Sequence, residues 1–307
     1  MKRNTFFLIV FILLAGKATA QKQTNQLTQL GLKGMVKFMA ARSYAALDNF
    51  GKPSKGERVN DNGDYLFNKA GYTEEQNIYN PNGSLRVRYT YRYNASDQIT
   101  GQNLYNPGGA LKSKFKYRYN SNGNLQEQSL LMPAGALISK YTYEYDNNSK
   151  QTAYNWYNSD GVLDEKTIYL YDSKGNQTDW VTLNADKTTL LRGTYRYDDR
   201  GNITEENLYK GNDSLEKKTT YSYDAGLNLD ETAAYGPNNS ISKKINYRYN
   251  SQNDLVEEIW LDTEGNQLEQ FTYKYEYDKR QNWTKKIIYR NGLPVTIIER
   301  EFEYFKN

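Results

Sequence analysis

The chain has 307 residues, with 40 Lys and Arg against 36 Asp and Glu, and this small net charge of +4 gives no case for nucleic-acid binding. It has no Cys and no His, which excludes disulfides, catalysis by Ser-His-Asp or Cys-His groups, and most zinc sites. Thirty Tyr residues are the compositional outlier, and Tyr favours strands. We therefore predict an all-β protein with no cofactor and no metal site.

The first 20 residues have the pattern of a secretory signal peptide. Lys2 and Arg3 precede an apolar run from Phe6 to Ala15, and Ala18-Thr19-Ala20 offers the small residues that a signal peptidase recognises, with cleavage before Gln21. The run is too short for a permanent membrane helix. We expect an exported, periplasmic or extracellular protein with no membrane span in the mature chain.

Residues 21–63 are predicted to form an N-terminal capping segment. Gly34 to Tyr44 alternates between apolar and polar residues, as in a strand that opens a sheet. A short helix over Leu30–Leu47 is the alternative.

A 26-residue period runs through residues 64–307. Phe67 is followed by tyrosines at steps of 26, and the last two steps, to Tyr277 and Tyr304, are 28 and 27. The tyrosine anchors are Tyr93, Tyr119, Tyr145, Tyr171, Tyr197, Tyr223, Tyr249 and Tyr277. A fixed period of this length indicates a repeat architecture. Because such a chain is built as a surface or scaffold and seldom hosts one unique catalytic constellation, we predict that it is not an enzyme.

Each repeat is predicted to be a β-hairpin. Asn or Asp follows the anchor of every full repeat, and Gly often comes three residues after it, as in Asp198 and Gly201, which is tight-turn chemistry. A strand such as Ile203–Lys210 follows, and after a second turn a strand such as Leu111–Tyr119 alternates in period two. The 28-residue step inserts two residues, which keeps each tyrosine on its own face.

The predicted fold is therefore an antiparallel meander of about nine hairpin repeats forming a long curved or spiral sheet. At about 4.8 Å per strand, roughly 18 to 20 strands make a ribbon on the order of 90 Å wide. Open twisted sheets rarely exceed about ten strands without curling, so we expect the tyrosines on the concave side.

The repeat resembles the YD repeat of the Rhs family. The segments that carry the resemblance are Tyr169-Leu170-Tyr171-Asp172-Ser173-Lys174-Gly175-Asn176 and Tyr195-Arg196-Tyr197-Asp198-Asp199-Arg200-Gly201-Asn202. The resemblance implies a spiral β-sheet; related repeats enclose toxic cargo in bacterial toxins and support adhesion in some animal surface proteins. We expect a short, repeat-only member without a toxin domain.

Two charged columns share the polar face of the predicted sheet. A basic column lies 21 residues after each anchor: Arg88, Lys114, Lys140, Lys166, Arg192, Lys218 and Lys244. An acidic column lies eight residues after: Glu75, Glu127, Asp179, Glu205, Glu231 and Glu257. The favoured interpretation is cross-strand charge pairing that keeps a long sheet soluble and in register. The alternative is that Arg88, Lys114, Lys140, Lys166 and Arg192 bind an anionic polymer.

Three tryptophans are the remaining candidates for ligand binding. Trp156 and Trp260 occupy a column otherwise filled by aliphatic residues, which favours packing, and Trp180 stands apart from it. The alternative is a stacking platform for sugar rings.

We predict a non-catalytic exported repeat protein whose β-sheet surface binds a protein or carbohydrate at the cell envelope. A glycan-processing enzyme that uses carboxylates alone, or a purely structural envelope component, is the alternative.

Overall fold

The computed structural model describes residues 25–59, 62–211 and 213–306. The predicted signal peptide lies outside these residues. The N-terminal elements are α1 (Gln26–Gln29), β1 (Val36–Asn49), β2 (Lys52–Arg58), β3 (Asn62–Phe67), β4 (Thr73–Tyr79), β5 (Leu85–Tyr93), β6 (Ile99–Tyr105) and β7 (Leu111–Tyr119). The middle strands are β8 (Leu125–Leu131), β9 (Leu137–Tyr145), β10 (Gln151–Tyr157), β11 (Leu163–Tyr171), β12 (Gln177–Asn184), β13 (Thr189–Tyr197) and β14 (Ile203–Lys210). The last are β15 (Ser214–Tyr223), β16 (Leu229–Tyr235), β17 (Ile241–Tyr249), β18 (Leu255–Leu261), β19 (Gln267–Tyr277), β20 (Trp283–Arg290) and β21 (Leu293–Tyr304).

The turn after each anchor has the predicted chemistry. In the first repeat, the Asn68 amide donates to the Tyr72 carbonyl and the Gly71 amide donates to the Asn68 carbonyl, both at 2.9 Å. The Asn68 side chain accepts a further bond from the Tyr72 amide at 3.0 Å. Gly71 has φ 86°, which glycine adopts without the steric penalty of a side chain. Local residues thus explain why the chain reverses here.

Six of the anchor hydroxyls, those of Tyr93 to Tyr223, each tie their repeat to the one before it. A β-bulge shifts the register between Arg118 and Tyr119, where β7 meets Leu125 of β8. The Tyr145 hydroxyl of the next repeat donates to the Leu125 carbonyl at 2.8 Å. The same bond joins Tyr93 to Thr73, Tyr119 to Ile99, Tyr171 to Gln151, Tyr197 to Gln177 and Tyr223 to Ile203. The first anchor, Phe67, has no preceding repeat and needs no hydroxyl.

Removing one anchor hydroxyl should destabilise the protein. We expect Tyr145→Phe to lower the free energy of unfolding by about 1 to 3 kcal/mol, because the Leu125 carbonyl loses its partner. Tyr89→Phe is the matched control, since no hydrogen bond joins the Tyr89 hydroxyl to another described residue. Urea unfolding followed by circular dichroism measures both; equal stabilities of the two variants would contradict the role of the anchor.

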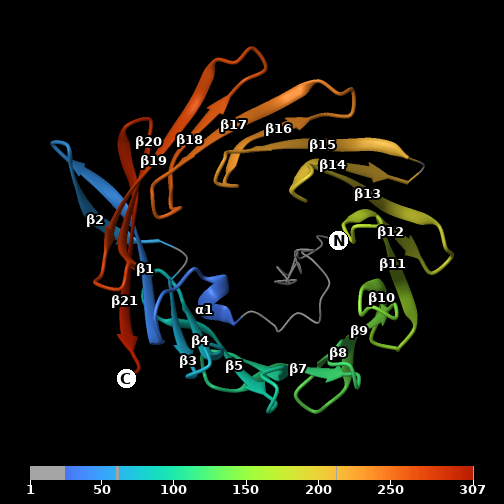
Figure 1. Cartoon of the computed structure of the whole chain (residues 1–307). Helices are drawn as coiled ribbons and strands as arrows, with labels where there is room; N and C mark the ends of the chain where they lie inside the picture. Colours follow the sequence, from blue (N-terminus) through green and yellow to red (C-terminus); the bar gives the residue numbers. More distant parts are fainter. Residues whose placement is uncertain (1–24, 60–61, 212, 307) are drawn as a thin grey trace.

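The sheet is closed, which corrects the prediction of an open curved or spiral sheet. β1 pairs with β3 on one side and with β21 on the other, and the remaining strands pair in chain order. In the described residues, twenty strands, β1 and β3 to β21, form a closed antiparallel barrel (Figure 1). Closure removes both edges of the sheet, which would otherwise expose unpaired backbone groups.

The N-terminal segment is what closes the ring. The predicted strand at Gly34–Tyr44 is present from Val36 onward, as the first part of β1, and the alternative helix over Leu30–Leu47 is wrong. Its predicted role as an end strand does not hold, because both of its edges are paired. β2 pairs with the second half of β1 and lies beside the ring.

The tyrosine face of the sheet lines the interior. Figure 1 draws α1 inside the ring of strands. Leu27 of α1 packs in one buried cluster with Val36, Met39 and Phe67. Because side chains alternate along a strand, Tyr65 and all the anchors share the face of Phe67, and the charged columns lie on the outer face.

The wall of the barrel is a single layer. At about 4.8 Å per strand, twenty strands make a ring at least about 30 Å across. This is wider than barrels of 16 to 18 strands, whose walls leave an aqueous channel. Among the described residues, the buried apolar side chains are few: Leu27, Val36, Met39, Ala40, Phe67, Tyr72, Ala153, Ala233 and Ile297. Most inward side chains are only partly buried.

Candidate binding surface inside the barrel

The predicted site residues fall on opposite faces of the wall. Trp180 stands directly opposite Tyr169, and Trp156 directly opposite Tyr141, so both point into the interior. Trp260 shares that face, since it contacts the inward ring of Phe271. The five predicted basic residues, Arg88, Lys114, Lys140, Lys166 and Arg192, lie on the outer face. The structure thus brings the aromatic candidates to one surface and separates them from the basic ones.

A polar belt runs around the inner wall beside the tyrosine rings. The Tyr91 hydroxyl donates to the Gln76 side chain at 3.1 Å, and Tyr117 donates to Gln102 at 3.3 Å. Later repeats keep the geometry and change the partner, as in Tyr221, which donates to Glu206 at 2.9 Å. The inner surface therefore alternates aromatic faces with hydrogen-bonding groups.

Burial shifts the ionisation of this tyrosine layer. It is the largest cause that raises the pKa of Tyr119, Tyr145 and Tyr197 to about 12. It also raises the pKa of Tyr117 and Tyr169. The inward hydroxyls are therefore neutral donors at physiological pH.

Trp180 is held by a glycine on the neighbouring strand. It stands opposite Gly193, and a Cβ at that glycine would lie 2.1 Å from the indole Nε1. The same nitrogen donates to the Tyr195 hydroxyl at 3.2 Å. Trp180 is thus packed flat on the backbone of the neighbouring strand.

Trp260 and Trp156 differ in how they are covered. The Lys243 ammonium lies 3.1 Å from the centre of the Trp260 ring, and the indole nitrogen donates to Glu258 at 3.0 Å. Trp156 has no ring contact, cation contact or hydrogen bond with any other described residue. Since Trp156 is only partly buried, it is the tryptophan best placed to stack on a ligand.

The outer charged columns form part of the ion pairs that the favoured interpretation predicts. Lys218 contacts Glu205 at 3.1 Å and Lys244 contacts Glu231 at 2.6 Å. Lys166 instead contacts Glu144, which lies outside the acidic column, at 2.8 Å. The hydrogen bond from Lys166 holds the pKa of the Glu144 carboxyl below its usual value.

The three remaining basic candidates have other partners. Arg88 and Lys140 each lie 4.5 Å from the ring centre of an outward tyrosine, Tyr105 and Tyr157. Lys114 donates to the Pro133 carbonyl at 3.1 Å. None of the three is within ion-pair distance of a carboxylate among the described residues.

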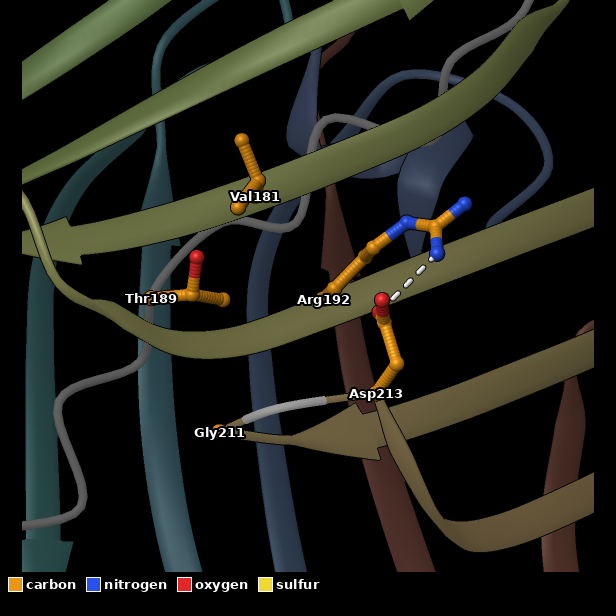
Figure 2. A pocket seen from close by; sticks show the side chains of 5 residues that line it. All are labelled: Val181, Thr189, Arg192, Gly211 and Asp213. Carbon is orange, nitrogen blue, oxygen red and sulfur yellow. Dashed lines mark hydrogen bonds and ion pairs between the residues drawn. The ribbon is translucent and has the colours of Figure 1, made fainter.

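A depression on the outer wall surrounds Arg192. It is lined by Val181, Thr189, Arg192, Gly211 and Asp213 (Figure 2). Arg192 contacts Asp213 at 3.1 Å and Asp179 at 3.2 Å. These hydrogen bonds, Asp179 first, raise the pKa of Arg192. With both carboxylates engaged, this guanidinium is already compensated and is a poor site for an anionic polymer.

Sequence reasoning missed a second group of inward residues. Lys286 and Arg300 occupy inward positions on β20 and β21, beside Trp283 and Tyr275. The sequence did carry a signal for them: at the equivalent positions of the other repeats, neither Lys nor Arg occurs. Trp283 packs against Tyr275 with ring centres 6.2 Å apart.

The described part of the chain offers little for metal chemistry or a helical membrane anchor. It contains no group of three or more Asp and Glu that could hold a metal ion. It also contains no helix long and apolar enough to cross a bilayer.

Comparison with known proteins adds only distant structural likeness. No family model matches the chain, and no curated protein matches it in sequence. A porin-like protein from Bacteroides uniformis is 13% identical with a TM-score of 0.34, over 87% of this chain and 96% of the other. A porin-like protein from Bacteroides vulgatus is 11% identical with a TM-score of 0.34, over 72% of this chain and 98% of the other.

A Tc holotoxin pore from Photorhabdus luminescens is also similar. It is 10% identical with a TM-score of 0.31, and the match covers 85% of this chain and 21% of the toxin chain. TM-scores this low do not establish a shared fold or function. Membership of the YD-repeat family stays a prediction.

Proposed function

We propose that this chain is an exported, non-catalytic envelope protein whose barrel interior binds a carbohydrate. The observation that carries the proposal is the inner wall itself, where partly exposed aromatic rings lie between amide, carboxylate and hydroxyl groups. Ligand sites combine aromatic surface with a few placed polar groups. A sugar ring packs its C–H face on an aromatic ring, and its hydroxyls need neighbouring donors and acceptors.

The carboxylates on the inner wall support binding over catalysis. Both oxygens of Glu258 accept hydrogen bonds, from Tyr273 at 2.8 Å and from Trp260 at 3.0 Å. Glu206 accepts from Tyr221. These acceptors hold the aromatic wall in place, which is a structural use of a carboxylate. A bound saccharide should accordingly be recovered uncut.

Glycan binding can be tested on Trp156. The folded protein should retain one class of polysaccharide from an immobilised panel. We expect Trp156→Ala to weaken that retention about tenfold or more, because the sugar ring loses the aromatic surface on which it stacks. Tyr157→Ala is the matched control: it removes the adjacent ring, which points outward beneath Lys140.

Circular dichroism separates a binding defect from unfolding. If Trp156→Ala unfolds, Trp156→Phe keeps an aromatic face and should retain fold and part of the binding. Retention of no polysaccharide by the folded protein, or undiminished retention by Trp156→Ala, would rule out the proposal.

A further inference from the structure

Two cations on the inner wall interrupt the repeat. Nine residues after each anchor the column reads Gln76, Gln102, Gln128, Tyr154, Trp180, Glu206, Thr232, Glu258 and Lys286. Four residues before each anchor it reads Gly63, Tyr89, Phe115, Tyr141, Thr167, Gly193, Thr219, Ile245, Tyr273 and Arg300. Lys286 and Arg300 are the only cations in their columns, and they lie on neighbouring strands. Residues required for the sheet itself recur in every repeat. Because Lys286 and Arg300 do not recur, the sheet does not explain their presence.

Both cations rest on aromatic rings and neither has a carboxylate partner. The Arg300 guanidinium lies 3.5 Å from the centre of the Trp283 ring. The Lys286 ammonium lies 4.6 Å from the Tyr273 ring centre and 5.5 Å from that of Tyr275. No hydrogen bond or ion pair joins either cation to another described residue, and Nε of Arg300 is buried without a partner.

The nearby acids are committed to other donors. Glu258 accepts from Tyr273 and Trp260, and Asp254 accepts from the Tyr277 hydroxyl at 2.6 Å. Their charges raise the pKa of Lys286, but burial and the charge of Arg300 outweigh them and lower it. Burial lowers the pKa of Arg300 to about 10. Two partly desolvated cations side by side are unfavourable unless an anion joins them.

The residues opposite Arg300 are small and have no polar side chain. Directly opposite Arg300 on β1 is Ala41, and the next residue across, on β3, is Gly63. Neither Ala41 nor Gly63 has a side chain that could accept a hydrogen bond from the guanidinium. A guanidinium presents paired donors that match the two oxygens of a carboxylate or sulfate.

We infer that Arg300 and Lys286 form an oxyanion-binding site on the inner wall, with Trp283 and Tyr275 as its aromatic floor. This deepens the proposed function and rests on it: the ligand is an acidic saccharide, whose carboxylate or sulfate meets the two cations while its rings stack on the wall.

Paired ligands separate charge from sugar recognition. Isothermal titration calorimetry on the intact protein would compare oligogalacturonate, its fully methyl-esterified form and inorganic sulfate. We expect the acidic form to bind about ten- to a hundredfold more tightly than the ester, the range expected for hydrogen bonds to a charged group. Lys286→Met and Arg300→Gln should abolish this difference, so that the acidic form binds no more tightly than the ester.

The matched control is Lys274→Met. Lys274 is exposed on β19, next to Tyr273 and Tyr275, but its ammonium lies 4.9 Å from the ring centre of outward Tyr289. It should keep the full preference. In the absence of ligand, Lys286→Met should raise the melting temperature, because an uncompensated cation is removed.

The outcomes distinguish the two proposals. If the ester and the acid bind equally and Lys286→Met changes neither, the anion site is wrong and the carbohydrate function stands. If neither saccharide binds but sulfate does, and Lys286→Met abolishes sulfate binding, the anion site stands and the carbohydrate function falls. If nothing binds, the anion site is overturned.

Discussion

A single engineered disulfide across the seam of the barrel should form readily and stabilise the protein strongly. Ala40 of β1 and Glu301 of β21 are directly opposite partners. Partners in an antiparallel pair have Cα atoms about 4.5 to 5.5 Å apart, within the range for a disulfide. The chain has no other Cys, so Ala40→Cys with Glu301→Cys can form only one intramolecular bond.

The expected stabilisation is large because the bond closes almost the whole chain. In the chain-entropy model, a loop of this length gains up to about 5 kcal/mol. Urea unfolding of the oxidised and reduced forms would measure the gain, and mass spectrometry would identify the bond. Ala40→Cys with Lys116→Cys is the control, since position 116 lies on β7, away from the seam.

The same experiment decides between a closed and an open sheet. In an open ribbon of about 90 Å, positions 40 and 301 would lie at opposite ends and could not be joined. Persistent free thiols in the Ala40→Cys, Glu301→Cys protein under mild oxidation would therefore contradict the closed barrel.

Alkaline pH should unfold the protein cooperatively. Burial raises the pKa of Tyr119, Tyr145 and Tyr197 to about 12, against about 10 in an unfolded chain. Because folding favours the neutral phenol, this stabilisation is fully present below pH 10 and is lost as the pH rises through about 12. The effect is large because nearly every repeat contributes such a tyrosine.

Tyrosine absorbance at 295 nm and circular dichroism would be followed together. We expect the inward tyrosines to ionise in one steep step that coincides with loss of the β signal. In urea the same chain should titrate smoothly near pH 10. Gradual ionisation near pH 10 with the β signal intact would show that the tyrosine layer is not desolvated.

Local features of the fold were predictable from residues that lie close in the chain. Asn68 and Gly71 specify a turn, and the alternation in Leu111–Tyr119 specifies a half-buried strand, so hairpins repeating every 26 residues followed directly. The tyrosine face was also predicted correctly as the concave one. The bulge that Tyr145 bridges was not predicted, because its partner Leu125 is recognisable only once the register is known.

The candidate site was only partly predictable. Trp156, Trp180 and Trp260 could be singled out by residue type, but their separate environments could not. Trp180 is packed because Gly193 lies opposite on the next strand, whereas Trp260 meets Lys243. Lys286 and Arg300 were overlooked because each stands in a different column, and only pairing of β20 with β21 brings them together.

The amino-acid sequence by itself determined the repeat: turn chemistry, strand parity and the separation of tyrosines from charges all act within one hairpin. Only the tertiary structure decided that the sheet closes. Closure depends on the summed curvature of many strands and on whether β1 meets β21. The contacts between these two strands join residues more than 250 positions apart, such as Ala40 and Glu301. No local pattern encodes the summed curvature, so the same hairpins are compatible with an open spiral. The pairing of both edges of β1 is what distinguishes the closed barrel.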